Sequence, residues 1–82
     1  MTKMELRGIV VQQGININTK KQFRRKLVIL RDLATKRYCE YDVTALIELN
    51  DKELVERIKK ELEKRGIIVI VPSHLKHLEV QE

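Results

Sequence analysis

A short basic run in the N-terminal half has the residue types that bind polyanions. Five of the seven residues in 20–26 are cationic and one is aromatic: Lys20, Lys21, Gln22, Phe23, Arg24, Arg25 and Lys26. Long cationic side chains can follow a phosphate backbone, and an aromatic ring such as that of Phe23 can stack on a base. The run therefore predicts contact with a nucleic acid.

Basic charge is concentrated around this run. Residues 1–41 contain ten Lys/Arg against three Asp/Glu, a net charge of +7, whereas residues 42–82 contain seven against nine, a net charge of −2. Arg7 and Arg37 extend the positive field if the early strands form one curled sheet, as in small barrel-like nucleic-acid binders. The alternative is that the cations keep an edge strand soluble and prevent edge-to-edge pairing. The candidate nucleic-acid-binding residues are Arg7, Lys20, Lys21, Phe23, Arg24, Arg25, Lys26 and Arg37.

The expected binding is electrostatic and only weakly sequence-selective. Phe23, Tyr38 and Tyr41 are the only aromatic residues, whereas surfaces for single-stranded nucleic acids usually present several stacking rings. No helix-turn-helix or zinc-finger spacing is visible, so sequence-specific recognition of DNA is not expected. The pattern does not distinguish DNA from RNA.

Other kinds of chemistry lack the residues they need. Three scattered glycines cannot form the clustered loop that lets backbone N–H groups approach a phosphate. His74 and His77 could share a metal on a helix with Cys39 as a third ligand, but exposed tail histidines are the simpler interpretation. Cys39 has no sequence neighbour besides Arg37 that would activate its thiol as a nucleophile. We therefore expect no enzyme, no metal site and no cofactor.

The N-terminal half is expected to form strands around an exposed connection. Residues 5–12 contain consecutive β-branched residues and predict a first strand, in which Gly8 marks a bulge. Residues 13–22 contain Gly, Asn and Lys and predict an exposed loop. The apolar centre of residues 24–31 predicts the second strand.

A turn and an ambiguous segment follow. Asp32 opens a four-residue link in which its carboxylate can accept backbone N–H bonds, as in a type I turn. Residues 36–43 predict the third strand. Residues 43–49 fit either a strand face or a helical turn.

One helix is clearly indicated in the C-terminal half. Asn50 is a suitable N-cap with Glu53 three residues later, the spacing of a capping box. Apolar residues then recur at helical spacing, and Gly66 is expected at the C′ position. Residues 66–71 lack polar alternation, which predicts a strand covered on both faces and central in the sheet. Residues 73–82 fit either one or two helical turns anchored by apolar residues or an edge strand.

These elements predict one α+β domain over residues 1–82. Its order is β-β-β-α-β: a small two-layer unit with an antiparallel three-stranded sheet, one long helix and a further central strand. The longest wholly apolar run is far shorter than the roughly 20 residues of a membrane-spanning helix. The lone Cys39 and the lack of a secretory signal favour a cytoplasmic protein, and many Lys, Glu and Ile with few Asn and Gln are typical of heat-adapted proteins.

The apolar runs support a second hypothesis for function. Residues 27–30 and 67–71 place apolar side chains on both faces of the sheet, although only one helix is available to cover them. A protein partner or a homodimer could cover the other face. A protein-interaction or homo-oligomeric assembly domain is therefore the alternative to a nucleic-acid-binding module.

Overall fold

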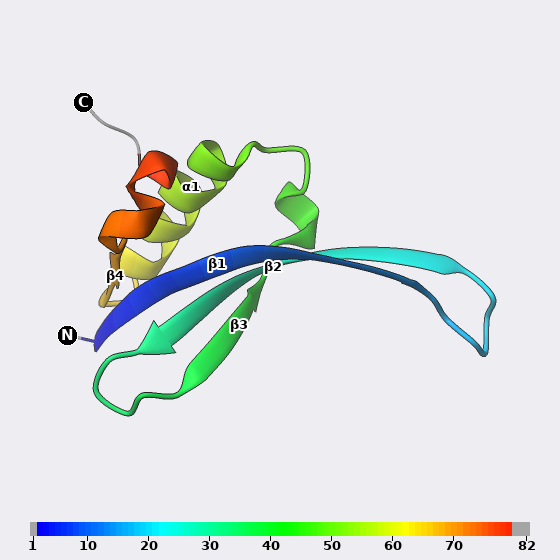
Figure 1. Cartoon of the computed structure of the whole chain (residues 1–82), viewed down its shortest axis with the longest axis horizontal. Helices are drawn as coiled ribbons and strands as arrows, with labels where there is room; N and C mark the ends of the chain where they lie inside the picture. Colours follow the sequence, from blue (N-terminus) through cyan, green and yellow to red (C-terminus); the bar gives the residue numbers. More distant parts are fainter. Residues whose placement is uncertain (1, 80–82) are drawn as a thin grey trace.

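The computed structural model describes residues 2–79 as a twisted four-stranded sheet with one α-helix on one side (Figure 1). The strands are β1 (Thr2–Ile15), β2 (Gln22–Asp32), β3 (Tyr38–Asp42) and β4 (Ile67–Ile70), in the order β3-β2-β1-β4. The two hairpins are antiparallel, and β4 runs parallel to β1. The predicted α+β class and β-β-β-α-β order are confirmed, with a mixed sheet.

The position predicted for the last strand is wrong. β4 lies at an edge of the sheet and pairs only with β1. The two hairpins already occupy both edges of β2, so a strand that returns after a helical crossover can join only one of the two outer edges of the sheet, and β4 joins that of β1. Its apolar sequence reflects contact with α1 on one side and half-buried isoleucines on the other.

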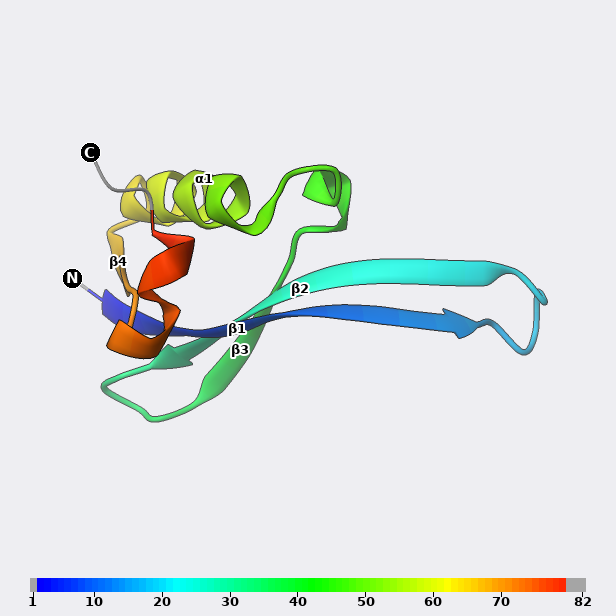
Figure 2. The same ribbon diagram turned by 45° about the horizontal axis from the view of Figure 1, so that its top comes forward.

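Helix α1 (Asp51–Glu63) lies along one side of the sheet (Figure 2), and the core lies between the two. Four apolar helix residues are buried: Leu54, Val55, Ile58 and Leu62. They belong to the same cluster as Met4 and Leu6 of β1 and Val28 and Leu30 of β2. We call this face of the sheet the helix side and the opposite face the open side.

Local capping starts the helix as predicted. The Asn50 Oδ1 accepts a hydrogen bond from the Glu53 backbone N–H at 2.9 Å, and the Asn50 amide donates to the Glu53 carboxylate at 2.9 Å. The predicted N-cap is thus confirmed, but the capping box is incomplete, because the Glu53 carboxylate binds the side-chain amide of Asn50 and not its backbone N–H. At the other end Gly66 lies two residues beyond the C-cap Lys64, one position later than the predicted C′, and has a φ of +79°.

Substitution of Gly66 by alanine is expected to lower the free energy of unfolding by about 1–2 kcal/mol, because a Cβ is disfavoured in the left-handed conformation. Gly8→Ala is the matched control: a Cβ built on Gly8 meets nothing within 4 Å and its φ is not in the left-handed region. Urea unfolding of both variants measures the difference. Equal free energies of unfolding for the two variants would contradict the left-handed conformation of Gly66.

The remaining local predictions have clear outcomes. The register shift between Leu6 and Gly8 confirms the bulge, and the Asp32 carboxylate accepts the N–H groups of Ala34 and Thr35, as predicted for its turn. β3 is shorter than the strand predicted for residues 36–43.

Two short 3₁₀ helices resolve the ambiguous segments. One, Thr44–Leu46, takes the helical alternative for residues 43–49. The other, Ser73–Leu78, takes the helical alternative for the tail, with Leu78 buried; residues 80–82 lie outside the described part. Within residues 2–79, no helix has the length and apolar character needed to cross a bilayer.

Candidate nucleic-acid interface

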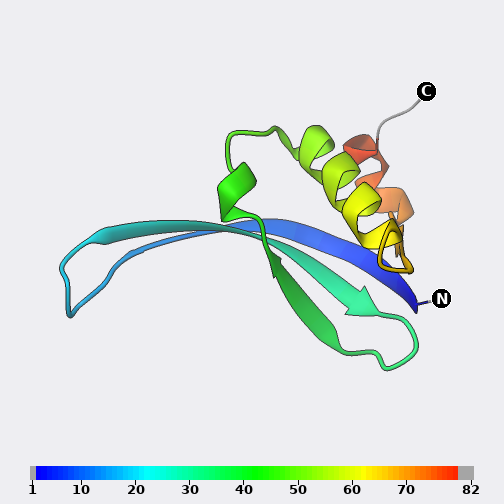
Figure 3. The same cartoon turned by 180° about the vertical axis from the view of Figure 1, so that it is seen from behind.

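β1 and β2 continue beyond the rest of the sheet as a two-stranded ribbon. We call residues 12–25 the arm: Gln12 pairs with Arg25 at its base and Ile15 with Gln22 at its end, and residues 16–21 form the turn. β3 pairs with β2 only from Leu27 onward, so the arm has no third strand. Figures 1 and 3 show it projecting away from the helix and from the N-terminus.

The arm corrects the loop predicted for residues 13–22. This segment is exposed apart from half-buried Gly14, but only residues 16–21 lack strand structure. The Asn16 carboxamide oxygen accepts hydrogen bonds from the N–H groups of Asn18 and Thr19, and the Lys20 N–H donates to the Asn16 carbonyl at 2.7 Å. These local bonds close the turn and set the register of the ribbon.

Four cationic side chains are displayed on the arm. They are exposed, and none has a carboxylate oxygen within 4.0 Å in the described part of the chain: Lys20, Lys21, Arg24 and Arg25. Residues 6–31 contain seven Lys/Arg and no Asp/Glu, so acidic groups are lacking along the hairpin. The arm therefore concentrates positive charge.

Lys26 does not belong to this surface, which corrects its inclusion among the candidate residues. Its side chain is 9% exposed and lies on the helix side, where its Nζ is 3.2 Å from a carboxylate oxygen of Asp51 and donates to the Leu49 carbonyl at 3.4 Å. Strand alternation puts Lys26 on the same face as Val28 of the core. Lys26 instead joins the base of the arm to the start of α1.

Arg7 and Arg37 lie apart from the arm. The Arg7 guanidinium donates to the Glu5 carboxylate at 2.7 Å, and this hydrogen bond raises the pKa of Arg7. Arg37 lies in the turn between β2 and β3, at the opposite end of the sheet from the tip of the arm (Figure 1). The structure thus groups five of the eight candidate residues: Lys20, Lys21, Phe23, Arg24 and Arg25.

The Phe23 ring is already in contact with the protein. A Cβ added to Gly14 would lie 2.8 Å from Cζ of Phe23, so the ring packs across the ribbon against the glycine. The Arg25 guanidinium lies 5.5 Å from the ring centroid. Phe23 therefore stabilises the arm. Only 40% of its surface is exposed, so less of the ring is available to stack on a base than the sequence analysis assumed.

Asp42, at the end of β3 near the base of the arm, forms its hydrogen bonds with Thr44, two residues later. Its carboxylate accepts hydrogen bonds from the Thr44 hydroxyl at 2.6 Å and from the Thr44 N–H at 2.9 Å. These bonds lower the pKa of Asp42, and the charge of Arg25 adds a smaller effect in the same direction. Asp42 therefore attracts Arg25 without forming an ion pair with it.

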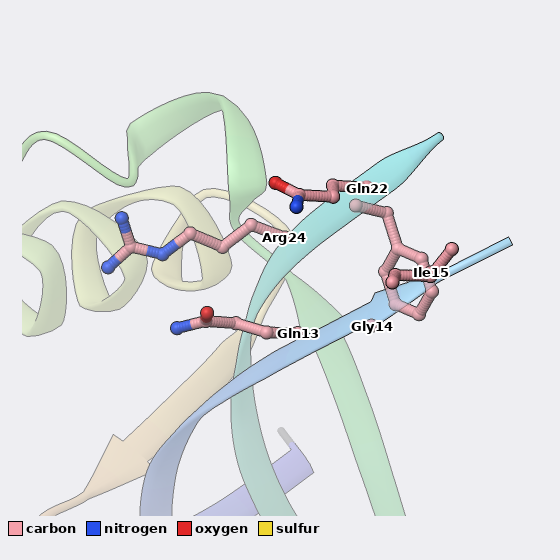
Figure 4. Close-up of a pocket in the computed structure, with 6 residues that line it drawn as sticks. Gln13, Gly14, Ile15, Gln22 and Arg24 are labelled. Atoms are coloured by element: carbon pink, nitrogen blue, oxygen red, sulfur yellow. The ribbon is translucent and has the colours of Figure 1, made fainter. Parts of the chain in front are cut away.

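Three glutamines of the arm were missed by the sequence analysis. Gln12 lies opposite Arg25, Gln13 lies opposite Arg24, and Gln22 lies opposite Ile15. Gln13, Gln22 and Arg24 help to line an open hollow and extend to the same side of the ribbon (Figure 4). The sequence could have identified these glutamines only through the pairing register of the hairpin. That register follows once the turn is assigned to residues 16–21.

The residues considered for metal binding do not form a cluster in residues 2–79. Cys39 is exposed on β3, and His74 and His77 are exposed on the C-terminal 3₁₀ helix. No group of three His, Cys, Asp or Glu side chains in the described ranges could hold a metal ion. No family model, curated protein or solved structure matches this chain.

Proposed function

We propose that this chain is a small nucleic-acid-binding module that contacts phosphates through the arm. The observation that carries the proposal is the display of four exposed cations on a projecting ribbon, without a carboxylate within 4.0 Å in the part of the chain described. Neutralising phosphates releases condensed counterions, which favours binding without reference to sequence. Contacts of this kind position the protein and carry little base information, so binding is weakly selective.

The shape of the arm supports this function. Lys20 and Lys21 lie at the tip, whereas Arg24 and Arg25 point to opposite faces because neighbouring strand residues alternate. A ribbon with charge at its tip and on both faces can contact phosphates on more than one side. The single free cysteine, Cys39, agrees with a reducing cytoplasm, where we propose that the module acts.

A salt titration tests the proposal. Fluorescence anisotropy with labelled duplex and single-stranded oligonucleotides should give a slope of log affinity against log salt of about −3.5 if four duplex phosphates are neutralised. Affinity for duplex would then fall by about 100-fold between 50 and 200 mM salt. Affinity that is undetectable at the low salt, or independent of salt, would contradict the proposal.

Exposed aliphatic side chains favour assembly as a second candidate function. Val10 and Val11 are each 41% exposed, Ile15 is 62% exposed and Ile17 is 89% exposed, all on or next to the arm. Val11 and Ile15 lie on one face of the ribbon and Val10 on the other, and these side chains could pack against a second copy or another protein. Sedimentation and the salt titration together separate the two candidate functions. A chain that only assembles has a mass that depends on concentration and shows no salt-dependent binding to nucleic acid.

A further inference from the structure

On each face of the arm an arginine lies directly opposite a glutamine. Residues directly opposite each other in an antiparallel pair point to the same face, so Gln12 shares a face with Arg25, and Gln13 shares the other with Arg24. Gln22 and Ile15 lie on the same face as Gln13 and Arg24, on the helix side. Figure 4 shows Gln13, Gln22 and Arg24 extending in the same direction.

These residue types match base edges better than they match phosphates. In the major groove of DNA, arginine makes two hydrogen bonds to guanine, glutamine makes two to adenine, and an aliphatic group contacts the thymine methyl. Glutamine carries no charge, so attraction to phosphates does not account for it. Within residues 2–79, the side chains of Gln13, Gln22 and Arg24 make no hydrogen bond to the protein, which leaves their polar groups available.

The shape of the arm distinguishes among nucleic acids. The major groove of B-form DNA is about 12 Å wide and admits a two-stranded ribbon, whose strands are about 4.8 Å apart. The major groove of A-form RNA is too deep and narrow for side chains to read. Single strands are bound mainly by stacking on aromatic rings. The arm has one such ring, Phe23, and it packs on Gly14.

We infer that the arm enters the major groove of duplex DNA with Gln13, Gln22 and Arg24 facing the base edges. Lys20, Lys21 and Arg25 then contact phosphates, and Arg24 contacts a fourth phosphate only on duplexes that lack the preferred sequence. Because the face that carries these three side chains is short, it can read only a few base pairs of a DNA sequence. This inference rests on the proposed function, since it assigns a ligand and an orientation to the same surface.

The choice of ligand is tested with three oligonucleotides of one length and sequence: duplex DNA, duplex RNA and single-stranded DNA. Duplex DNA should bind about 10-fold or more tightly than either competitor at about 150 mM salt. Equal or tighter binding of RNA or of the single strand would overturn the inference and leave the proposed function standing. Absence of binding to all three would overturn both.

The orientation is tested with Arg24→Lys and its matched control Arg25→Lys, which both keep the charge. A preferred sequence is first selected from a pool of random duplexes. Arg24→Lys should reduce the preference for a G·C pair in that sequence by about 5- to 100-fold, because lysine is a point charge that lacks the fork of arginine. Its affinity for unselected duplexes should stay within about twofold, since phosphate contacts need only charge.

Arg25→Lys should retain the preference, because Arg25 lies on the other face beside Phe23. The orientation would be overturned if the two variants behaved alike, if only Arg25→Lys lost the preference, or if selection yielded no preferred sequence. Thermal unfolding of both variants shows whether each is folded. Affinity for unselected duplexes is measured in the same samples, so a failure to select a preferred sequence can be distinguished from a loss of binding.

Discussion

Replacing the four exposed cations of the arm with alanine is expected to weaken binding to duplex nucleic acid by about 100-fold or more at about 50 mM salt. The variant removes Lys20, Lys21, Arg24 and Arg25. Each neutralised phosphate contributes about 0.9 to the slope of log affinity against log salt, so the slope should approach zero. All four are exposed and none belongs to the buried core cluster, so the melting temperature should change little. Anisotropy titrations and thermal unfolding measure the two effects.

The matched control removes the same number of cations from the helix. Lys52, Arg57, Lys60 and Lys64 are exposed, and two of them pair with glutamates of the helix: Lys60 with Glu56 and Lys64 with Glu61. Their replacement with alanine lowers the net charge equally but leaves the arm intact. We expect a change in affinity of about threefold or less, as for distant screened charges. Equal losses in the two variants would show that net charge, rather than the arm, governs binding.

The parts of the fold that depend on local sequence were predicted correctly. The start of α1 depends on Asn50 and Glu53, which lie three residues apart and interact in any context where a helix forms. The turn after β2 depends similarly on Asp32 and the two N–H groups that follow it. Such contacts span a few residues, so their residue types alone are informative.

Apart from small shifts at the ends of α1 and β3, the errors concern partners distant in sequence. Gly14, the asparagines and the lysines suggested a loop, because local propensity contains no information about the backbone bonds that β1 and β2 exchange. Lys26 appeared to belong to the basic run, but it lies on the core face and meets Asp51, 25 residues later. The position of β4 likewise depended on which of the two free edges, that of β1 or that of β3, it joined.

The candidate site was therefore only partly visible in the sequence. Composition identified Lys20, Lys21, Arg24 and Arg25 as a basic run, and the structure displays them together. The division of Arg24 and Arg25 between two faces, and the pairing of each with a glutamine, depend on a register that follows from the turn at residues 16–21. Charge could be read from composition, whereas the direction of each side chain could not.

Deleting the arm is expected to abolish binding while the domain remains folded. Residues 13–24 would be replaced with Asn-Gly, which joins Gln12 to Arg25 through a two-residue hairpin turn. Gln12 and Arg25 are directly opposite each other, so the shortened strands keep their register. Every member of the buried core cluster lies outside the deleted segment, so circular dichroism should be native and the melting temperature should shift by about 5 °C or less.

A smaller deletion separates loss of the basic surface from loss of the turn. Replacing residues 17–20 with Asn-Gly removes Ile17 and Lys20 but keeps Lys21, Arg24 and Arg25. The shorter turn can close because the hydrogen-bonded pair Asn16 and Lys21 flanks the replaced residues. This variant should bind about 10-fold more weakly than the intact chain, as expected for one lost phosphate contact. A full deletion that still binds would place the interface elsewhere on the domain. A full deletion that unfolds beside a folded smaller deletion would show that the ribbon stabilises the sheet, because the two variants share the same turn and differ only in the paired strands.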